Sequence, residues 1–98
     1  MVLEAIDFAQ YYEELKMSEF TVFGRPGCGY CVAAKRLLES KGLDCNYIDM
    51  YEEGLSKAEV EQMVGRPVHT VPQILHGETY VGGYSELVPY LKKLESAA

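Results

Sequence analysis

The fold is decided by the stretch Glu19-Phe20-Thr21-Val22-Phe23-Gly24-Arg25-Pro26-Gly27-Cys28-Gly29-Tyr30-Cys31. Its first five residues are rich in β-branched and aromatic side chains and stop at Gly24, which predicts a buried strand. From Gly29 onward the apolar side chains recur at a helical spacing, and Gly42 suits the position just after a helix. The expected apolar face of this helix carries Cys31, Ala34, Leu37 and Leu38. A Cys-x-x-Cys pair therefore lies where a strand passes into a helix.

Strand and helix signals continue to alternate after this helix. Residues 45–48 are a short strand candidate. The run Ser56-Lys57-Ala58-Glu59 matches a capping box and opens a helix that ends at Gly65. The apolar positions of that helix are Val60, Met63 and Val64. Up to this point the pattern predicts a β-α-β unit followed by a further helix.

The last third of the chain predicts a hairpin and a final helix. Residues 72–75 and 79–81 are short apolar runs separated by His76-Gly77-Glu78, a spacing that suits two antiparallel strands. Ser85 is the expected cap of the last helix, and Pro89 falls near its first turn, where a missing N–H costs little. The apolar positions of this helix are Leu87, Leu91 and Leu94.

The order of these elements defines a fold class. An amphipathic helix is also expected at residues 4–16, from the spacing of Ala5, Phe8, Tyr12 and Leu15. The remaining order, βαβα and then ββα, is that of an α/β protein with a thioredoxin-like fold, a four-stranded mixed sheet flanked by helices. We expect residues 1–98 to form a single domain. Residues 1–17 are expected as an additional N-terminal helix that covers a sheet edge or forms a partner surface.

Composition and charge exclude several classes of function. With 98 residues and 48% hydrophobic side chains, the chain is expected to build one core. The formal net charge of −6, without clustered Lys or Arg, argues against nucleic-acid binding. No apolar run approaches the roughly 20 residues of a membrane span, and the acidic opening stretch does not resemble a signal peptide. We therefore expect a cytoplasmic protein that does not bind membranes.

Cys28 and Cys31 are the candidate catalytic residues. At a helix N-terminus the unpaired N–H groups and the helix dipole stabilise a thiolate, and such thiols have pKa values of about 3.5–7.5. Cys28 is therefore the expected nucleophile, and Cys31, one turn on and facing the core, is the expected resolving thiol. Half of a zinc site is the alternative, but Cys45, His69 and His76 do not supply a second ligand pair at zinc spacing, so no metal is expected. Cys45 is interpreted as a core residue.

Two further motifs are weak when each is taken alone. Thr70-Val71-Pro72 precedes a predicted strand, and its proline is either a candidate for a cis peptide bond or an ordinary strand-edge residue. Gly82-Gly83-Tyr84-Ser85 combines backbone freedom with a helix N-terminus, which suits a bound carboxylate. A simple turn and a helix cap would explain the same four residues equally well.

Together, Gly24-Arg25-Pro26-Gly27-Cys28-Gly29-Tyr30-Cys31, Thr70-Val71-Pro72-Gln73-Ile74 and Gly82-Gly83-Tyr84-Ser85 closely resemble the glutaredoxins. The three motifs occur in the family's order over roughly residues 18–95, and residues 56–68 are similar to the small bacterial and viral dithiol members. The resemblance implies a thioredoxin fold and an enzyme that reduces protein disulfides and glutathione mixed disulfides, with glutathione as the electron donor. It also suggests ribonucleotide reductase as a protein substrate, and a monomer.

The resemblance implies roles for individual residues. Cys28 would take up the glutathionyl group, and Cys31 would serve the dithiol route. The backbone of Val71 would pair with the cysteinyl part of glutathione, in a groove shaped by Thr70 and Pro72. The positions that hold the γ-glutamyl carboxylate in the family correspond to Gly83, Tyr84 and Ser85. Those that face the glycine end correspond to Arg25, Tyr30 and Lys57.

Gly29 departs from the family's commonest active-site tetrapeptide, which has proline there. Glycine leaves one more backbone N–H free and a looser first turn, so the Cys28 thiolate would gain a donor. Some glutaredoxins without this proline bind a [2Fe-2S] cluster between two subunits, through the first cysteine and glutathione. A cluster-binding dimer with Cys28 as a metal ligand is therefore the alternative function. A thioredoxin-type carrier served by a flavoenzyme is disfavoured, because no Trp stands beside the motif.

Overall fold

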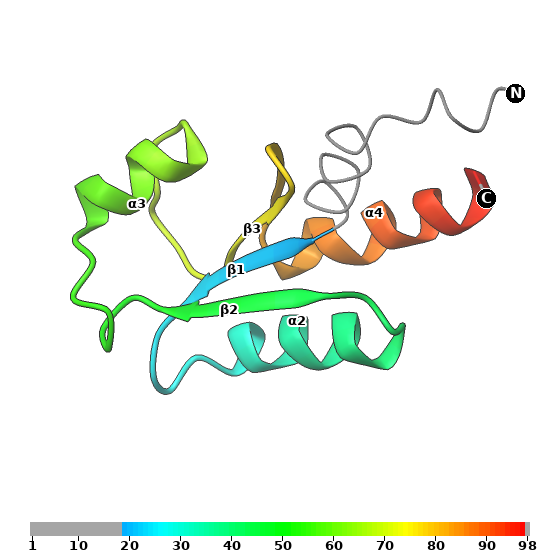
Figure 1. Cartoon of the computed structure of the whole chain (residues 1–98), viewed down its shortest axis with the longest axis horizontal. Helices are drawn as coiled ribbons and strands as arrows, with labels where there is room; N and C mark the ends of the chain where they lie inside the picture. The colour runs from blue at the N-terminus through cyan, green and yellow to red at the C-terminus, as the bar shows by residue number, and fades with distance from the viewer. Residues whose placement is uncertain (1–18, 98) are drawn as a thin grey trace, which may run out of the picture.

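The computed structural model describes residues 19–97, and the helix predicted at residues 4–16 lies outside them. The described residues form four strands and three helices, which Figure 1 shows in their arrangement. The strands are β1 (Phe20–Gly24), β2 (Cys45–Asp49), β3 (Gln73–His76) and β4 (Thr79–Gly82). The helices are α2 (Gly29–Ser40), α3 (Lys57–Val64) and α4 (Tyr84–Ala97). Each strand and helix predicted within this range is present, with small shifts at its ends.

The four strands form one mixed sheet in the order β2-β1-β3-β4. β1 pairs parallel with β2 and antiparallel with β3, and β3 pairs antiparallel with β4. This is the thioredoxin-like arrangement, so the predicted fold class is confirmed. The register places Phe23, near the end of β1, opposite Gln73 at the start of β3. The chain that leaves β1 therefore runs beside the chain that enters β3.

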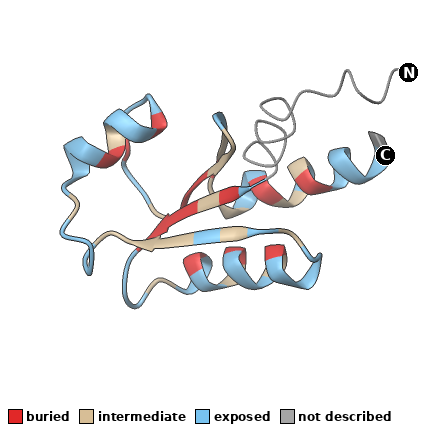
Figure 2. Cartoon of the chain, in the orientation of Figure 1, coloured by how far each residue is buried: buried red, intermediate tan, exposed pale blue. Residues whose placement is uncertain are grey.

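Two clusters of buried side chains cover the two faces of the sheet. Successive side chains of a strand point to opposite faces, so Val22 belongs to one cluster and Phe23 to the other. The first cluster joins the sheet to α2 and α4 and consists of Phe20, Val22, Ala34, Leu38, Ile74, Leu87 and Leu91. The second joins the sheet to α3 and consists of Phe23, Val60, Val64 and Val68. Figure 2 shows the buried residues on β1 and on the sheet-facing sides of α2 and α4, and Figure 1 shows α2 and α3 on opposite sides of the strands.

The ends of α2 and α3 follow from their local sequence. The Ser56 hydroxyl accepts the Glu59 N–H at 3.1 Å, and the Glu59 carboxylate accepts the Ser56 N–H at 2.8 Å, so the predicted capping box is present. α3 ends at Gly65, whose φ of 79° lies in the left-handed region that favours glycine. The same conformation occurs at Gly42, with φ at 71°, two residues after the last residue of α2.

The start of α4 differs from the sequence prediction. Ser85 lies in the first turn of α4, so it is not the cap. The residue that precedes the helix is Gly83, whose carbonyl accepts the N–H groups of Glu86 and Leu87 at 3.2 and 3.0 Å. Pro89 consequently lies in the second turn rather than the first. Its missing N–H deprives the Ser85 carbonyl of a helical donor, which is tolerated because Ser85 is exposed to solvent.

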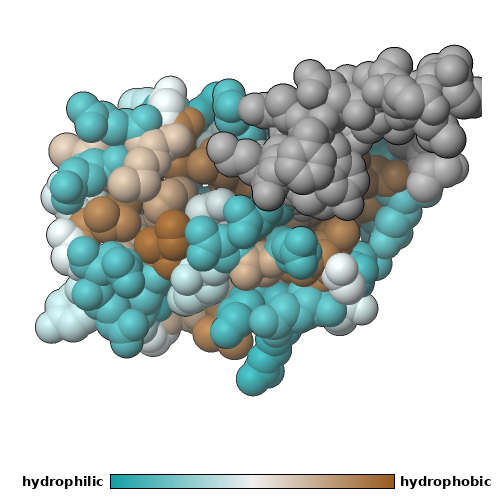
Figure 3. Space-filling view, viewed as in Figure 1, coloured by the Kyte–Doolittle hydropathy of each residue, from teal (hydrophilic) through white to brown (hydrophobic). Residues whose placement is uncertain are grey.

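Two smaller expectations were also wrong. The turn of the hairpin is shorter than predicted, because His76 pairs with Thr79 and leaves two residues between the strands. Met63 is 51% exposed, because α3 is short and meets the sheet along a narrow stripe that Val60 and Val64 fill. On the face drawn in Figure 3, hydrophilic residues cover most of the described surface, with smaller hydrophobic areas between them.

Candidate active site

Cys28 and Cys31 form a disulfide at the N-terminus of α2. Cys28 is the residue that caps the helix, and its sulfur accepts the Cys31 N–H at 3.1 Å. Cys28 is half-buried, whereas Cys31 is fully buried. The Cys28 sulfur therefore lies at the positive end of a 12-residue helix, and an approaching group meets it before it meets Cys31.

Gly24 lets the first turn of α2 pack closely on the end of β1. A Cβ atom at this position would lie 3.0 Å from the Cβ of Cys31 and 2.8 Å from the Cζ of Tyr47. Such separations are shorter than van der Waals contact, so a side chain would push the helix or the Tyr47 ring away. The glycine between the strand and the cysteine pair therefore keeps Cys31 close to the sheet.

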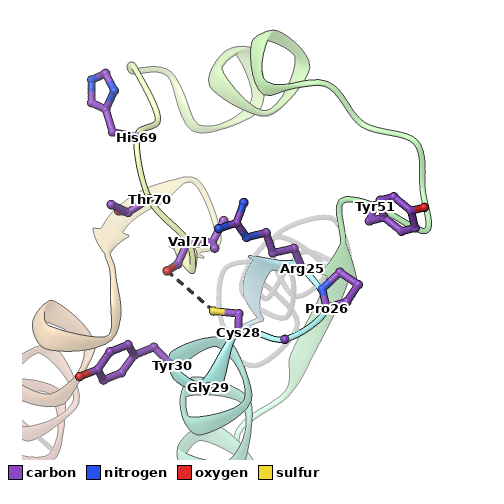
Figure 4. Close-up of a pocket in the computed structure, with 10 residues that line it drawn as sticks. Arg25, Pro26, Cys28, Gly29, Tyr30, Tyr51, His69, Thr70 and Val71 are labelled. Atoms are coloured by element: carbon purple, nitrogen blue, oxygen red, sulfur yellow. Dashed lines mark hydrogen bonds between the residues drawn. The ribbon is translucent and has the colours of Figure 1, made fainter.

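The loop before β3 lies against the cysteine pair. The Val71–Pro72 peptide bond is cis, which is one of the two states expected from the sequence. The Val71 carbonyl oxygen lies 3.9 Å from the Cys28 sulfur, and a dashed line marks this approach in Figure 4. A disulfide sulfur carries no proton, so in this oxidised form the approach is a contact rather than a hydrogen bond.

Three adjoining hollows form a groove beside the Cys28 sulfur, and Thr70 and Val71 line all three. The largest hollow has a volume of about 740 Å³. The other predicted residues that line the groove are Arg25, Cys28, Tyr30, Lys57, Pro72, Gly83, Tyr84 and Ser85. Among the predicted site residues, Cys31 is the exception, because it is buried behind Cys28. The fold therefore brings the three sequence motifs together on one surface feature.

The groove also contains residues that the sequence prediction missed. Figure 4 shows the Arg25 side chain extending into the groove, with Tyr51 and His69 at its outer rim. His69 directly precedes the Thr70-Val71-Pro72 motif, so its position in the sequence could have identified it as a groove residue. Tyr51 follows β2 in a loop without a recognisable pattern, where the Asp49 carboxylate accepts its N–H at 2.9 Å. The sequence carried no signal for the direction of that loop.

The rim of the groove is cationic and aromatic, although the chain has a net charge of −6. Arg25 and Lys57 are exposed on the side of α3. On the side of α4, Tyr30 is 68% exposed, and its ring centroid lies 5.8 Å from that of Tyr84. Positive charges at one end and aromatic rings near the other suit an elongated ligand with a carboxylate at the cationic end.

A side chain of α4 occupies the N-terminus of that helix. Glu86 Oε1 accepts the Gly83 N–H at 2.8 Å. A carboxylate is therefore held at one of the backbone positions predicted to bind a ligand carboxylate, as helix N-termini favour. A ligand carboxylate at the Gly83 N–H would replace that of Glu86. The pattern of a glycine followed three residues later by glutamate resembles a capping box and was a usable signal.

Cys45 lies away from the groove. It begins β2, pairs with Phe20 at the other end of β1, and packs against the buried cluster of that face. Burial and the negative charge of Glu39 raise the pKa of the Cys45 thiol. It is half-buried rather than fully buried, and its raised pKa disfavours the nucleophilic thiolate.

Within residues 19–97, no group of three or more His, Cys, Asp or Glu side chains is placed to hold a metal ion. A [2Fe-2S] cluster is commonly held by four cysteine thiolates. Cys28 is the one cysteine of the described range that lines the groove, so this chain would supply one cysteine ligand there. In the same range, no helix is long and apolar enough to cross a membrane.

The fold and the site define a thioredoxin-like protein with a redox-active cysteine pair at the start of a helix. Comparisons with known sequences narrow this class. A sequence model of the glutaredoxin family matches residues 20–81. Glutaredoxin 1 of Salmonella typhimurium is 49% identical over 76% of this chain and 92% of that protein. The glutaredoxin of Vibrio cholerae is 46% identical over 74% of this chain and 88% of that protein.

Solved structures agree with the sequence comparison. The solution structure of reduced Escherichia coli glutaredoxin superposes with a TM-score of 0.69 at 38% identity, over 76% of this chain and 94% of that one. The crystal structure of a buckwheat glutaredoxin–glutathione complex superposes with a TM-score of 0.63 at 25% identity, over 86% and 78%. The chain belongs to the glutaredoxin family and is a thiol-disulfide oxidoreductase.

Proposed function

We propose that the protein reduces protein disulfides and glutathione mixed disulfides with glutathione as the electron donor. The observation that carries the proposal is the position of the Cys28 sulfur, at the N-terminus of α2 and 3.9 Å from the Val71 carbonyl in the groove. The helix dipole and the Cys31 N–H stabilise a thiolate at this place. Cys28 is the nucleophile of the proposed reaction, and the buried Cys31 is the resolving thiol.

The reaction proceeds by thiol-disulfide exchange. The Cys28 thiolate attacks the glutathione sulfur of a mixed disulfide; the old S–S bond breaks, and the substrate protein leaves as a thiolate. A second glutathione thiolate then attacks the glutathione sulfur on Cys28, which releases glutathione disulfide and restores the Cys28 thiolate. With a protein disulfide, the Cys28 thiolate attacks one of the two sulfurs, the protein S–S bond breaks, the other sulfur becomes a thiolate, and the substrate stays bound to Cys28 as a mixed disulfide. The Cys31 thiolate then attacks the Cys28 sulfur, releases the reduced substrate and leaves the Cys28–Cys31 disulfide, which two glutathione thiolates reduce in turn, with release of glutathione disulfide.

The groove is the proposed glutathione site. Val71 would pair its backbone with the cysteinyl part of the tripeptide, as in the addition of a short strand, while Thr70 and Pro72 shape the wall. The γ-glutamyl carboxylate would take the place of the Glu86 carboxylate at the Gly83 N–H. The contacts proposed for this end are Gly83, Tyr84 and Ser85. The similarity to the buckwheat glutaredoxin–glutathione complex supports this assignment.

The glycine end of glutathione is proposed to lie at the cationic rim. Arg25 and Lys57 line the hollow on the side of α3. Tyr30, the third residue proposed for this end, lines the hollow beside Cys28 and also the hollow on the side of α4, so it lies between the two ends. The carboxylate of the terminal glycine would be attracted by Arg25 and Lys57, both of which are exposed. Since exposed charges are screened, raising the ionic strength should weaken the interaction.

The remaining assignments stay predictions. These are a single domain over residues 1–98 with an extra helix at residues 1–17, a cytoplasmic location, a monomer, and ribonucleotide reductase among the protein substrates. The [2Fe-2S] dimer also stays a prediction, based on Gly29, and no contact of the described residues favours it over the enzyme.

The test is a coupled assay with glutathione, glutathione reductase, NADPH and a small glutathione mixed disulfide. We expect the intact protein and Cys31→Ser to be active, and Cys28→Ser to fall to background. Cys45→Ser is the matched control, because it removes a thiol outside the groove, and it should keep full activity. An inactive intact protein, or one that accepts electrons only from a thioredoxin-type reductase, would contradict the proposal.

A further inference from the structure

A buried polar side chain connects the sheet to the groove. Gln73, the first residue of β3, is 4% exposed, and both ends of its amide are hydrogen-bonded. The Tyr80 hydroxyl donates to Gln73 Oε1 at 2.6 Å, and Gln73 Nε2 donates to the Thr70 carbonyl at 2.7 Å. We call this chain of two hydrogen bonds the Tyr80–Gln73 relay.

The relay fixes the peptide group that precedes Val71. The Thr70 carbonyl and the Val71 N–H belong to the same planar trans peptide unit, in which they point in opposite directions. Holding the carbonyl toward Gln73 therefore turns the Val71 N–H away from Gln73. The hydrogen bonds of the described residues include none from this N–H, and Val71 lines all three hollows of the groove.

The other end of the relay is held from outside the sheet. Tyr80 lies on β4, and the Arg66 guanidinium sits 4.1 Å above the centre of its ring. A guanidinium over an aromatic face is attracted to it and restricts where the ring can move. The Tyr80 hydroxyl is therefore presented to Gln73 by a ring that is held on one face by Arg66.

We propose that Gln73 and Tyr80 are positioning residues that orient the Val71 N–H for the backbone of a bound tripeptide. This inference rests on the proposed glutathione site. Without the Tyr80 hydroxyl, Gln73 Oε1 is left buried without a donor, and the amide turns to find one. The Thr70 carbonyl then loses its fixed partner, so the Val71 N–H must be ordered at the moment of binding, which weakens binding.

The test compares two tyrosines that each donate or share one side-chain hydrogen bond. Tyr80→Phe removes the relay. Tyr90→Phe is the matched control, because its hydroxyl lies 2.7 Å from His76 Nδ1, outside the residues that line the groove. With one hydrogen bond at stake, we expect Tyr80→Phe to raise KM for the glutathione mixed disulfide about fivefold to tenfold, with kcat within about twofold. Tyr90→Phe should leave KM unchanged, even if it lowers the thermal stability of the protein as much as Tyr80→Phe does.

Gln73→Met is the second variant, since it keeps the length of the side chain and removes both hydrogen bonds. It should raise KM at least as much as Tyr80→Phe does. NMR order parameters of the free protein give an independent readout, and we expect the Val71 N–H to be less ordered in both variants and unchanged in Tyr90→Phe. Unchanged KM and order parameters in both relay variants would overturn the relay, as would an equal rise of KM in Tyr90→Phe. An intact protein that does not turn over the glutathione substrate would instead overturn the proposed function, and the order parameters would then decide alone whether the relay holds the loop.

Discussion

The two ends of β1 are built from similar side chains that are used differently. At the start of the strand, the Phe20 and His76 rings stack with centroids 4.2 Å apart, and His76 Nδ1 shares a hydrogen bond with the Tyr90 hydroxyl at 2.7 Å. We call Phe20, His76 and Tyr90 the far-end cluster. At the groove end, Tyr30 and Tyr51 are 68% and 80% exposed.

The difference separates stability from chemistry. The far-end cluster buries Phe20 fully and His76 and Tyr90 partly, and it uses the Tyr90 hydroxyl and His76 Nδ1 in a hydrogen bond with each other, so few of its groups remain for a ligand. The groove end leaves the Tyr30 and Tyr51 rings exposed beside the exposed charges of Arg25 and Lys57, which forgoes the free energy of burying the rings but supplies binding groups. Changes at the far end should therefore alter the free energy of unfolding, and changes at the groove end should alter kinetics.

The largest effect on stability is expected from Phe20→Ala at the far end. Phe20 is fully buried, and removing its ring should lower the free energy of unfolding by about 3–5 kcal/mol. Urea unfolding measures this loss, and Phe20→Leu gives a milder version should the alanine variant not fold. KM for the glutathione substrate should stay that of the intact protein. A change in KM in the folded leucine variant would break the separation between the two ends.

A smaller effect is expected from Ser56→Ala, which breaks the capping box of α3. The Ser56 hydroxyl accepts the Glu59 N–H, and its loss should cost about 1 kcal/mol of unfolding free energy. Lys57, the first residue of α3, should then be held less firmly at the rim of the groove. Ser40→Ala is the matched control, because the Ser40 hydroxyl donates to the Leu37 carbonyl at the C-terminal end of α2 and caps no helix N-terminus. Equal stability losses in the two variants would contradict the role of the cap.

The smallest effect is a pH dependence from His76. Burial lowers the pKa of His76 below its usual value of 6.5. The unfolded chain therefore takes up this proton at a higher pH than the folded protein does. The stabilisation that His76 contributes to the free energy of unfolding is fully present above about pH 6.5. It is lost as the pH falls below that value toward the lowered pKa.

Urea unfolding between about pH 5.5 and 7.5 tests this sign. In His76→Gln, the loss of stability toward lower pH should become smaller. His69→Gln, which changes an exposed histidine in the groove, should retain the part due to His76. An intact protein that gains stability from His76 as the pH falls would show that the far-end cluster favours the charged ring.

The elements were predictable because their signals are local. The capping box at Ser56 and Glu59 and the glycine after α2 each involve neighbouring residues, and the structure has both. The cap of α4 was predicted wrongly. Ser85 has a side chain that is typical of a helix cap, but Gly83 is the residue that precedes the helix. Propensity identified a helix start there, and only the backbone hydrogen bonds fixed its first residue.

The groove was predictable only in part. The three motifs lie on it because each has its own signal in the sequence. The Tyr80–Gln73 relay had none, since it joins residues seven positions apart across a hairpin whose register includes an irregularity between Ile74 and Leu75. Tyr51 was not predicted as a groove residue for a similar reason, because the direction of the loop after β2 depends on contacts in the folded protein rather than on a sequence pattern.

Cys28 is the thiol proposed to take up glutathione. The direct measurement is to treat the reduced Cys31→Ser protein with glutathione disulfide and to find the adduct by intact mass and peptide mapping. We predict one glutathionyl group, on Cys28, while Cys45, whose thiol has a raised pKa, stays unmodified. Modification of Cys45 in place of Cys28, or no adduct at all, would contradict the assignment of Cys28 as the nucleophile.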